Sequence, residues 1–267
     1  LMSTDHVSTH PDSPLHGNGI GSEAINLAAI RQEYTKGGLK EGDLPDNPLS
    51  LFNRWLHEAI DAQVDEPTAM LVGTVSPEGQ PSTRTVLLKD LHDGKFIFYT
   101  NYESRKGQQI ETNPCVSLSF LWYGLERQVH IEGRAVELSA AESDAYFDSR
   151  PLGSRIGAIV SPQSRVIGSR TGLMREFVRM RDRYGLSHGQ KQEGDQKANN
   201  IPLADSPASQ DLRDHPASID ISGLKRPDYW GGYAVTPERI EFWQGRENRL
   251  HDRILYTREG DGERLAP

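Results

Sequence analysis

The sequence predicts a mainly β protein with flanking helices, an α+β fold whose antiparallel strands close into a barrel. From residue 68 onward, short runs rich in β-branched and aromatic residues follow one another, which is typical of strands. Turn signals such as Pro77-Glu78-Gly79 and Asp93-Gly94 separate these runs and favour an antiparallel meander. Little helix lies between the strands, and closing the sheet into a barrel would remove its exposed edges.

Five strands are expected before residue 140, and a hairpin is expected near the C-terminus. The five strands cover residues 68–75, 83–89, 95–100, 115–122 and 126–138. The hairpin starts with a strand at 239–244 and turns at Arg246-Glu247-Asn248. Its second strand contains Arg249, His251 and Arg253 at alternating positions.

Helix signals mark five segments, at residues 22–37, 48–60, 104–113, 139–150 and 171–184. The clearest starts are Asn47 before Pro48, and the capping box formed by Ser139 and Glu142. Apolar residues recur at helical spacing in the second and fifth segments, and we expect them to face the core: Leu49, Phe52, Leu56 and Ile60, then Leu173, Phe177, Met180 and Tyr184.

The chain is expected to form a single domain over residues 22–267, preceded by a flexible tail over residues 1–21. The tail is polar, lacks periodicity and contains neither an apolar core nor a run of arginines, so a cleaved targeting segment is not expected. Residues 185–226 contain no aromatic residue and many Gly, Pro, Gln, Asp and Ser residues. We interpret this segment as a surface insert that is mostly disordered.

The composition excludes several classes of protein. A chain of 267 residues can bury a sizeable core. Its net charge of -8 argues against a nucleic-acid surface, and no window approaches the ~20 apolar residues that span a membrane. The single cysteine, Cys115, excludes an intrachain disulfide. We expect it to be a buried small side chain in a reducing, cytoplasmic compartment.

The C-terminal hairpin carries the first candidate site. On a strand of period two, Arg249, His251 and Arg253 share one face, and these cations would be tolerated around a carboxylate or phosphate. Trp243 on the paired strand offers a flat apolar neighbour for a ring, so we predict a site for an aromatic phosphate. Alternating arginines also occur on solvated faces, and the spacing alone leaves that alternative open.

Two further stretches predict anion binding. Arg105 and Lys106 open a helix behind Ser104, and free amides at a helix N-terminus together with two cations favour phosphate. Tyr146 and Arg150 lie four residues apart on the fourth helix, with Ser154 shortly after, as in a phosphate cradle. An exposed basic pair and simple packing remain the respective alternatives. The histidines show neither HxH nor HExxH spacing, so no metal site is expected.

Several separate motifs occur along the chain in the same order as in one known protein family. Trp243-Gln244-Gly245, Arg249 to Arg253 and the terminal Arg264 to Pro267 resemble the C-terminal signature of the pyridoxine (pyridoxamine) 5'-phosphate oxidases. The resemblance continues through residues 31–39, 84–89, 99–106, 125–128 and 146–151, and covers most of the chain from about Ala29 onward except the insert. One departure is the stretch between Tyr256 and Arg264, which is several residues shorter than the family pattern.

The resemblance implies an FMN-binding split β-barrel of antiparallel, Greek-key topology. It also implies the oxidation of pyridoxamine 5'-phosphate and pyridoxine 5'-phosphate to pyridoxal 5'-phosphate (EC 1.4.3.5), a step of vitamin B6 metabolism. A hydride would pass from C4' to flavin N5, and dioxygen would reoxidise the flavin to give hydrogen peroxide. The expected assembly is a homodimer with FMN at the interface.

The same resemblance assigns roles to individual residues. Arg249 and His251 would be catalytic. Substrate binding would involve Arg31, Tyr34, Lys89, Tyr146, Arg150, Ser154, Arg249 and His251. FMN would be bound by Arg84, Thr85, Val86, Leu87, Leu88, Lys89, Tyr99, Thr100, Arg105, Lys106, Gln128, Gln163, Ser164, Trp243 and Arg253.

Two alternative functions share much of this pattern. Another split-barrel flavin reductase would keep the FMN residues, but not Tyr146, Arg150, Ser154, Arg249 and His251 as a set. A non-catalytic protein that binds FMN or pyridoxal phosphate would look the same in sequence. Turnover with dioxygen separates such a protein from an oxidase.

Overall fold

The computed structural model describes residues 33–39, 42, 44–184, 223–258 and 265–266. Residues 34–267 form one compact unit, and residues 1–33 form another, of which only Glu33 is described. The expected tail, Arg31 and nearly all of the expected insert therefore lie outside the described residues. None of the described helices has the length and apolar character needed to span a membrane.

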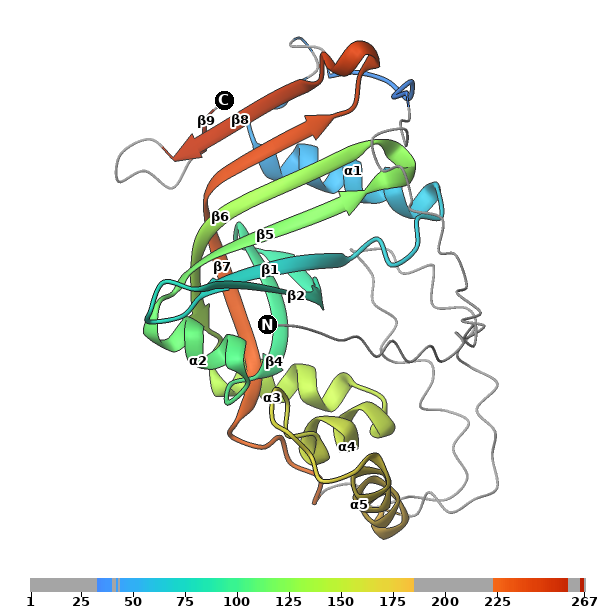
Figure 1. The fold of residues 1–267 in the computed structure, drawn as a ribbon, viewed down its shortest axis with the longest axis vertical. Helices are drawn as coiled ribbons and strands as arrows, with labels where there is room; N and C mark the ends of the chain where they lie inside the picture. Colours follow the sequence, from blue (N-terminus) through green and yellow to red (C-terminus); the bar gives the residue numbers. More distant parts are fainter. Residues whose placement is uncertain (1–32, 40–41, 43, 185–222, 259–264, 267) are drawn as a thin grey trace, which may run out of the picture. The chain divides into compact units, whose positions relative to one another are not determined.

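One antiparallel sheet of nine strands forms the body of the larger unit, in the order β2-β1-β5-β6-β7-β4-β3, with β8 beside β7 and β9 beside β8 (Figure 1). The bounds are β1 Ala69–Val75, β2 Pro81–Leu87, β3 Asp90–His92, β4 Lys95–Asn101, β5 Cys115–Trp122, β6 Arg127–Glu137, β7 Trp230–Gln244, β8 Asp252–Arg258 and β9 Leu265–Ala266. Among the described strands no pairing joins β2 to β3, so the curved sheet is a split barrel.

The long strand β7 connects two regions of the unit. It covers 15 residues rather than the six predicted, pairs with β4 near Trp230 and pairs with β8 near Gln244. A bulge between Glu132 and Gly133 of β6 lies opposite Pro237, which has no N–H for the ladder. A Cβ on Gly133 would lie 2.2 Å from the carbonyl oxygen of Thr236, so this crossing requires glycine.

Helix α1 (Pro48–Asp61) packs its apolar stripe against the sheet and builds the main core. The predicted cap is present, because the Asn47 side chain accepts a hydrogen bond from the Leu49 amide at 2.9 Å. Phe52 meets Phe96 and Phe120 edge to face, with ring centroids 5.0 and 4.9 Å apart. Leu49 and Ile60 are only partly buried, and Leu51 and Trp55, which the prediction omitted, are fully buried.

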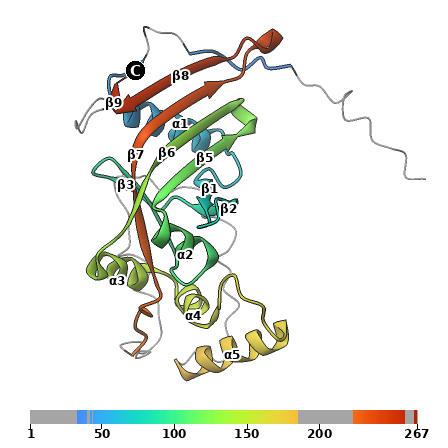
Figure 2. The same cartoon turned by 60° about the vertical axis from the view of Figure 1, so that its left-hand side comes forward.

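Four more helices flank the sheet: α2 (Arg105–Thr112), α3 (Ala140–Ser149), α4 (Leu152–Val160) and α5 (Arg170–Arg183). Figure 2 shows α3 and α4 around the lower part of β7. The predicted capping box of Ser139 and Glu142 is present in α3. Helix α4 was not predicted. The prediction that one face of α5 packs into the core was wrong for the single chain, because no residue of α5 is buried.

Three local predictions were wrong. Strand β8 begins only at Asp252, because Asn248 and Arg249 adopt left-handed backbone angles (φ 54° and 60°) and lengthen the turn. Arg249, His251 and Arg253 therefore do not alternate along one strand. Cys115 is exposed rather than buried. The described part of the first expected helix, residues 33–37, is irregular.

Candidate functional site

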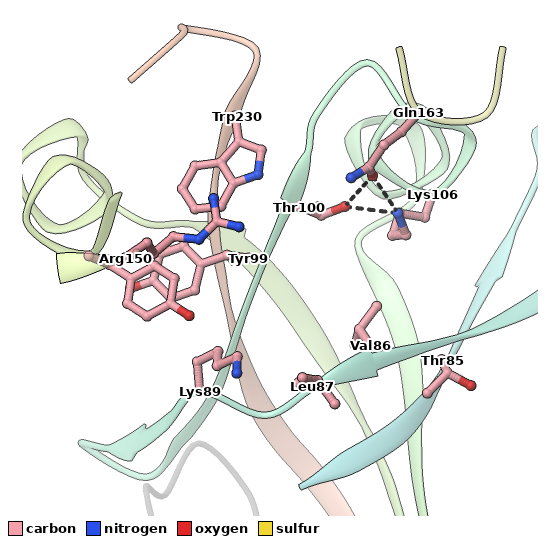
Figure 3. A pocket seen from close by; sticks show the side chains of 11 residues that line it. Thr85, Val86, Leu87, Lys89, Tyr99, Thr100, Lys106, Arg150, Gln163 and Trp230 are labelled. Carbon is pink, nitrogen blue, oxygen red and sulfur yellow. Dashed lines mark hydrogen bonds between the residues drawn. The ribbon is translucent and has the colours of Figure 1, made fainter. Parts of the chain in front are cut away.

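A cavity of about 290 Å³ opens between β2, β4, α2, α3 and the start of β7 (Figure 3). Its lining combines lysine and arginine side chains with aromatic rings, hydroxyls and one amide. The lining residues are Thr85, Val86, Leu87, Lys89, Tyr99, Thr100, Lys106, Tyr146, Arg150, Gln163 and Trp230. All except Trp230 belong to the residues that the sequence indicated for cofactor or substrate.

The cavity is strongly basic. Lys89, Lys106 and Arg150 line it, and no aspartate or glutamate is among the lining residues. Burial lowers the pKa of each of these three cations. Among the lining residues these cations have no acidic partner, although Glu66 outside the lining favours the charged form of Lys89. Cations in a partly desolvated cavity favour an anion there, and the three side chains are spread along it.

Lys106 occupies one end, at the N-terminus of α2. Its Nζ donates to Thr100 Oγ1 at 2.8 Å, Ser104 Oγ at 3.3 Å and Gln163 Oε1 at 3.4 Å. Burial, with repulsion from Arg84, lowers the pKa of Lys106 to about 8. These contacts hold the ammonium group at the N-terminal end of a helix, which is a favourable arrangement for phosphate.

Arg150 occupies the other end and does not lie on the helix as predicted. Helix α3 ends at Ser149 because Arg150 is extended and Pro151 follows. The guanidinium lies over the ring of Trp230, with Cζ 4.6 Å from the ring centroid, and its Nη1 is buried without a hydrogen-bond partner among the described residues. Lys89 lies near enough for Arg150 to lower its pKa further.

Three rings stack beside Arg150. Tyr99 and Tyr146 are nearly parallel at a centroid distance of 3.6 Å, and Tyr99 lies 5.6 Å from Trp230. Burial raises the pKa of both tyrosines, so both keep their phenolic protons near neutral pH. The Tyr146 hydroxyl can therefore act as a donor at the cavity wall.

Four predicted cofactor residues of this region, and the predicted substrate residue Ser154, do not line the cavity. Arg84 donates to the Val72 carbonyl at 3.1 Å and to Thr74 Oγ1 at 2.6 Å, and does not line the cavity. Leu88 is 4% exposed and belongs to the core. Arg105 is exposed beside Arg84. Ser154 and Ser164 are exposed and lie outside the lining set.

A second group, here called the turn cluster, consists of Tyr34, Trp243 and His251. Tyr34 meets Trp243 and His251 edge to face at 5.7 and 5.3 Å, and Trp243 lies 4.6 Å from His251. The Arg246 amide donates to His251 Nδ1 at 3.1 Å, which makes Nδ1 the acceptor and leaves the ring proton on Nε2 in the neutral form.

The remaining predicted residues surround the turn cluster. Gln128 pairs directly with Trp243 across the sheet, and Trp243 pairs with Arg253. Arg249 is exposed, and the Arg253 side chain is 64% exposed with Glu241 at 3.6 Å. The structure thus separates the predicted site residues into two groups, one at each end of β7.

Trp230 is the lining residue that the sequence reasoning missed. Gly231 and Gly232 follow it, and added Cβ atoms there would lie 2.1 Å from Tyr102 Oη and 2.5 Å from Leu138 Cδ1. The sequence signal that could have identified Trp230 is an aromatic residue followed by two glycines at the start of a strand. Glycines in a strand mark backbone that is closely packed, and such packing fixes the position of the neighbouring ring.

Known proteins match the chain along its length. Residues 56–184 match the family model described as pyridoxamine 5'-phosphate oxidase, and residues 230–267 match the pyridoxine 5'-phosphate oxidase C-terminal dimerisation region. A pyridoxine/pyridoxamine 5'-phosphate oxidase of Bacteroides fragilis is 68% identical over 100% of both chains. One of Bacteroides thetaiotaomicron is 58% identical over 91% of this chain and 99% of the relative.

Solved structures agree on the fold. PhzG from Burkholderia lata 383, in complex with tetrahydrophenazine-1-carboxylic acid, has a TM-score of 0.66 at 26% identity and covers 86% of this chain and 98% of its own. A pyridoxamine 5'-phosphate oxidase-related, FMN-binding protein of Nostoc punctiforme has a TM-score of 0.57 at 15% identity, over 84% and 97%. The chain therefore belongs to the pyridoxine/pyridoxamine 5'-phosphate oxidase family.

Proposed function

We propose that this protein uses FMN to oxidise pyridoxamine 5'-phosphate and pyridoxine 5'-phosphate to pyridoxal 5'-phosphate. The observation that carries the proposal is the basic cavity with a cationic group at each end. Lys106 lies at one end, and Lys89 with Arg150 lies at the other. Two phosphate groups, one of the cofactor and one of the substrate, match this arrangement.

The donor set at the Lys106 end fits the phosphate of FMN. Lys106 supplies a held ammonium group at the N-terminus of α2, and Arg105 lies one residue away. Thr85, Val86 and Leu87 of β2 line the wall beyond it, where a flat ring system could lie. When bound, FMN supplies the acceptor for the hydride from C4' and the route of electrons to dioxygen.

The donor set at the other end fits the substrate phosphate. In this proposal phosphate oxygens would be bound by the Nη1 of Arg150, which has no partner among the described residues, with the ammonium group of Lys89 and the Tyr146 hydroxyl beside it. Binding of this remote phosphate orients the pyridine ring, and orientation at contact distance is what a hydride transfer needs most.

Residues of the turn cluster complete the site in this proposal. His251 presents its Nε2 proton as a donor because Nδ1 accepts from the Arg246 amide. It would bind the polar edge of the pyridine ring, and Arg249 would act beside it. Tyr34 would cover the ring, because it packs on both Trp243 and His251.

The positions of the two groups support a homodimer. Trp230 begins β7 and Trp243 lies near its end, so about 40 Å would separate them along a straight strand. One chain therefore does not bring its own turn cluster to its own cavity along β7. The cavity of one subunit and the turn cluster of its partner can form one site, with FMN between them, and the match to a dimerisation region supports this assembly.

The first test is an anaerobic absorbance titration with pyridoxamine 5'-phosphate. Bleaching of a flavin band near ~450 nm, restored by air as pyridoxal 5'-phosphate appears, is the expected result. A flavin that does not bleach would assign the chain to another split-barrel reaction or to a binding role. If the purified protein does not bind added FMN, the proposed function is wrong.

Subunit mixing tests the shared site. Arg150→Met and His251→Ala homodimers should each be nearly inactive. After the two are exchanged into mixed dimers, one site in each mixed dimer is intact, and activity should rise to about one quarter of the wild-type value. No recovery in a sample that contains mixed dimers would assign both groups to sites within single chains.

A further inference from the structure

Trp230 stands out because it lines the cavity although none of the phosphate chemistry requires an indole. The residue is 4% exposed, and its carbonyl accepts from Arg226 Nη1 at 2.6 Å, which fixes the start of β7. Figure 3 shows the guanidinium of Arg150 in front of the indole ring. The distance of 4.6 Å from Cζ to the ring centroid is within the range of a cation–π contact.

The indole acts on a side chain that has few other restraints. Arg150 lies outside α3, in extended backbone before Pro151, and its Nη1 has no partner among the described protein atoms. Lys89 lies close enough to repel it. A long cationic side chain in this setting would turn toward solvent unless something held it inside, because burial opposes its charge and lowers its pKa.

We propose that Trp230 is a positioning residue that holds the Arg150 guanidinium inside the cavity, so that its free Nη1 is already placed for the phosphate of the substrate. The inference rests on the function proposed above and adds a residue to it. The negative face of the indole offsets the charge of Arg150 while leaving its N–H groups free for the ligand. An acidic partner would offset the charge too, but would occupy those N–H groups.

The stack of rings explains why a tryptophan serves here. Tyr99 lies nearly parallel to Trp230 at an interplanar angle of 15°, and Phe147 meets the indole edge to face at 67°. These ring contacts restrict how far the buried indole can move away from Arg150. Loss of the ring should free Arg150 and weaken phosphate binding, while FMN binding at the Lys106 end should change little.

The test measures binding of pyridoxal 5'-phosphate to the FMN-loaded protein. Trp230→Leu should raise its Kd about tenfold, which corresponds to about 1.4 kcal/mol, and the Kd of FMN should stay within about twofold. Tyr229→Leu is the matched control, since it removes a ring that packs against the same aromatic cluster but makes no ring contact with Trp230 among the described residues. An equal loss in both variants would overturn the proposal in favour of packing alone.

A double-mutant cycle separates action through Arg150 from a general effect. In an Arg150→Met background, Trp230→Leu should add less than about twofold to the Kd of pyridoxal 5'-phosphate, because the group that it positions is gone. Undiminished loss in that background would overturn the proposal. If the wild-type holoprotein does not bind pyridoxal 5'-phosphate at all, the proposed function fails together with this inference. Binding that is insensitive to Trp230 overturns the inference alone.

A graded measurement covers the case in which Trp230→Leu does not fold. Fluorinated tryptophans introduced at position 230 alone keep the shape of the ring and progressively weaken its negative face. The Kd of pyridoxal 5'-phosphate should rise with each added fluorine. A constant Kd across the series would overturn the proposal.

Discussion

The cavity and the turn cluster differ in how their cations are held. In the cavity, Lys106 has three hydroxyl or amide partners and Arg150 lies on an indole, so both are fixed within the single chain. Around the turn cluster, Arg249 is exposed and Arg253 has only a distant carboxylate on an exposed face. The first group is preorganised for anions, and the second is arranged at a surface.

This contrast predicts that the cavity, rather than the turn cluster, binds phosphate in the single subunit. Preorganised, desolvated cations bind phosphate strongly because little reorganisation is needed. Solvated arginines gain strength only when another surface excludes water from them. In the proposed dimer the turn cluster supplies the second surface for the cavity of the partner subunit.

The largest expected effect is on kcat/KM and comes from replacing Arg150 in the cavity. Arg150→Met should lower kcat/KM for pyridoxamine 5'-phosphate about 100-fold, because a buried charged hydrogen bond to phosphate is worth about 2.7 kcal/mol. FMN content should stay near that of the wild type. Steady-state kinetics check this, with exposed Arg134→Met as the control. An equal fall in kcat/KM in the Arg134→Met control would contradict a specific role for the buried guanidinium of Arg150.

The Lys106 end should affect the cofactor rather than the substrate. Lys106→Met should raise the Kd of FMN about 30-fold, since one charged contact to the phosphate is lost. Fluorescence quenching of FMN on uptake by apoprotein measures the change, and exposed Lys95→Met serves as the control. A variant that binds FMN normally but substrate weakly would reverse the assignment of the two ends.

The close crossing of β6 and β7 at Gly133 lies between the cavity and the turn cluster, and its stability can be tested directly. Gly133→Ala should destabilise the fold by about 2 kcal/mol, because its Cβ would lie 2.2 Å from backbone. Gly124→Ala is the control, as nothing lies within 4 Å of a Cβ there. Denaturant unfolding of both variants provides the measurement. Equal stability of the two would contradict the close crossing at the bulge.

The pH dependence of FMN uptake follows from Lys106. In the apoprotein its pKa is lowered to about 8 from 10.5, so the amine loses its proton as the pH rises through about 8. Affinity for the phosphate dianion should therefore be nearly full at about pH 7 and fall about tenfold by about pH 9. Lys106→Arg should remove the fall, because arginine stays charged. A pH-independent Kd in the wild type would contradict the lowered pKa.

The smallest effect is expected at the surface. Arg253→Ala should change the free energy of unfolding by less than about 0.5 kcal/mol, since an exposed pair 3.6 Å from Glu241 contributes little. Its effect on FMN retention in the dimer should be larger, about threefold, if the partner's cavity desolvates it. Thermal unfolding and FMN titration together check this. A stability loss without a change in FMN retention would place Arg253 in the fold rather than the site.

Much of the local structure could be predicted because its causes are local. The cap at Asn47, the capping box at Ser139 and the turn at Asp93-Gly94 each depend on residues a few positions apart. The sequence also marked nearly every residue that lines the cavity. The motif resemblance supplied that part, since composition and spacing left solvated alternatives open.

The sequence by itself determined the strand-rich fold class, most element positions and the residue types of an anion site. Only the tertiary structure decided that β7 runs on to Trp230, that Arg150 leaves its helix to lie on that indole, and that Arg249 sits in a left-handed turn. Each of these depends on contacts between residues far apart in the chain, such as Gly133 against Thr236. A periodicity of two or 3.6 residues contains no information about such contacts.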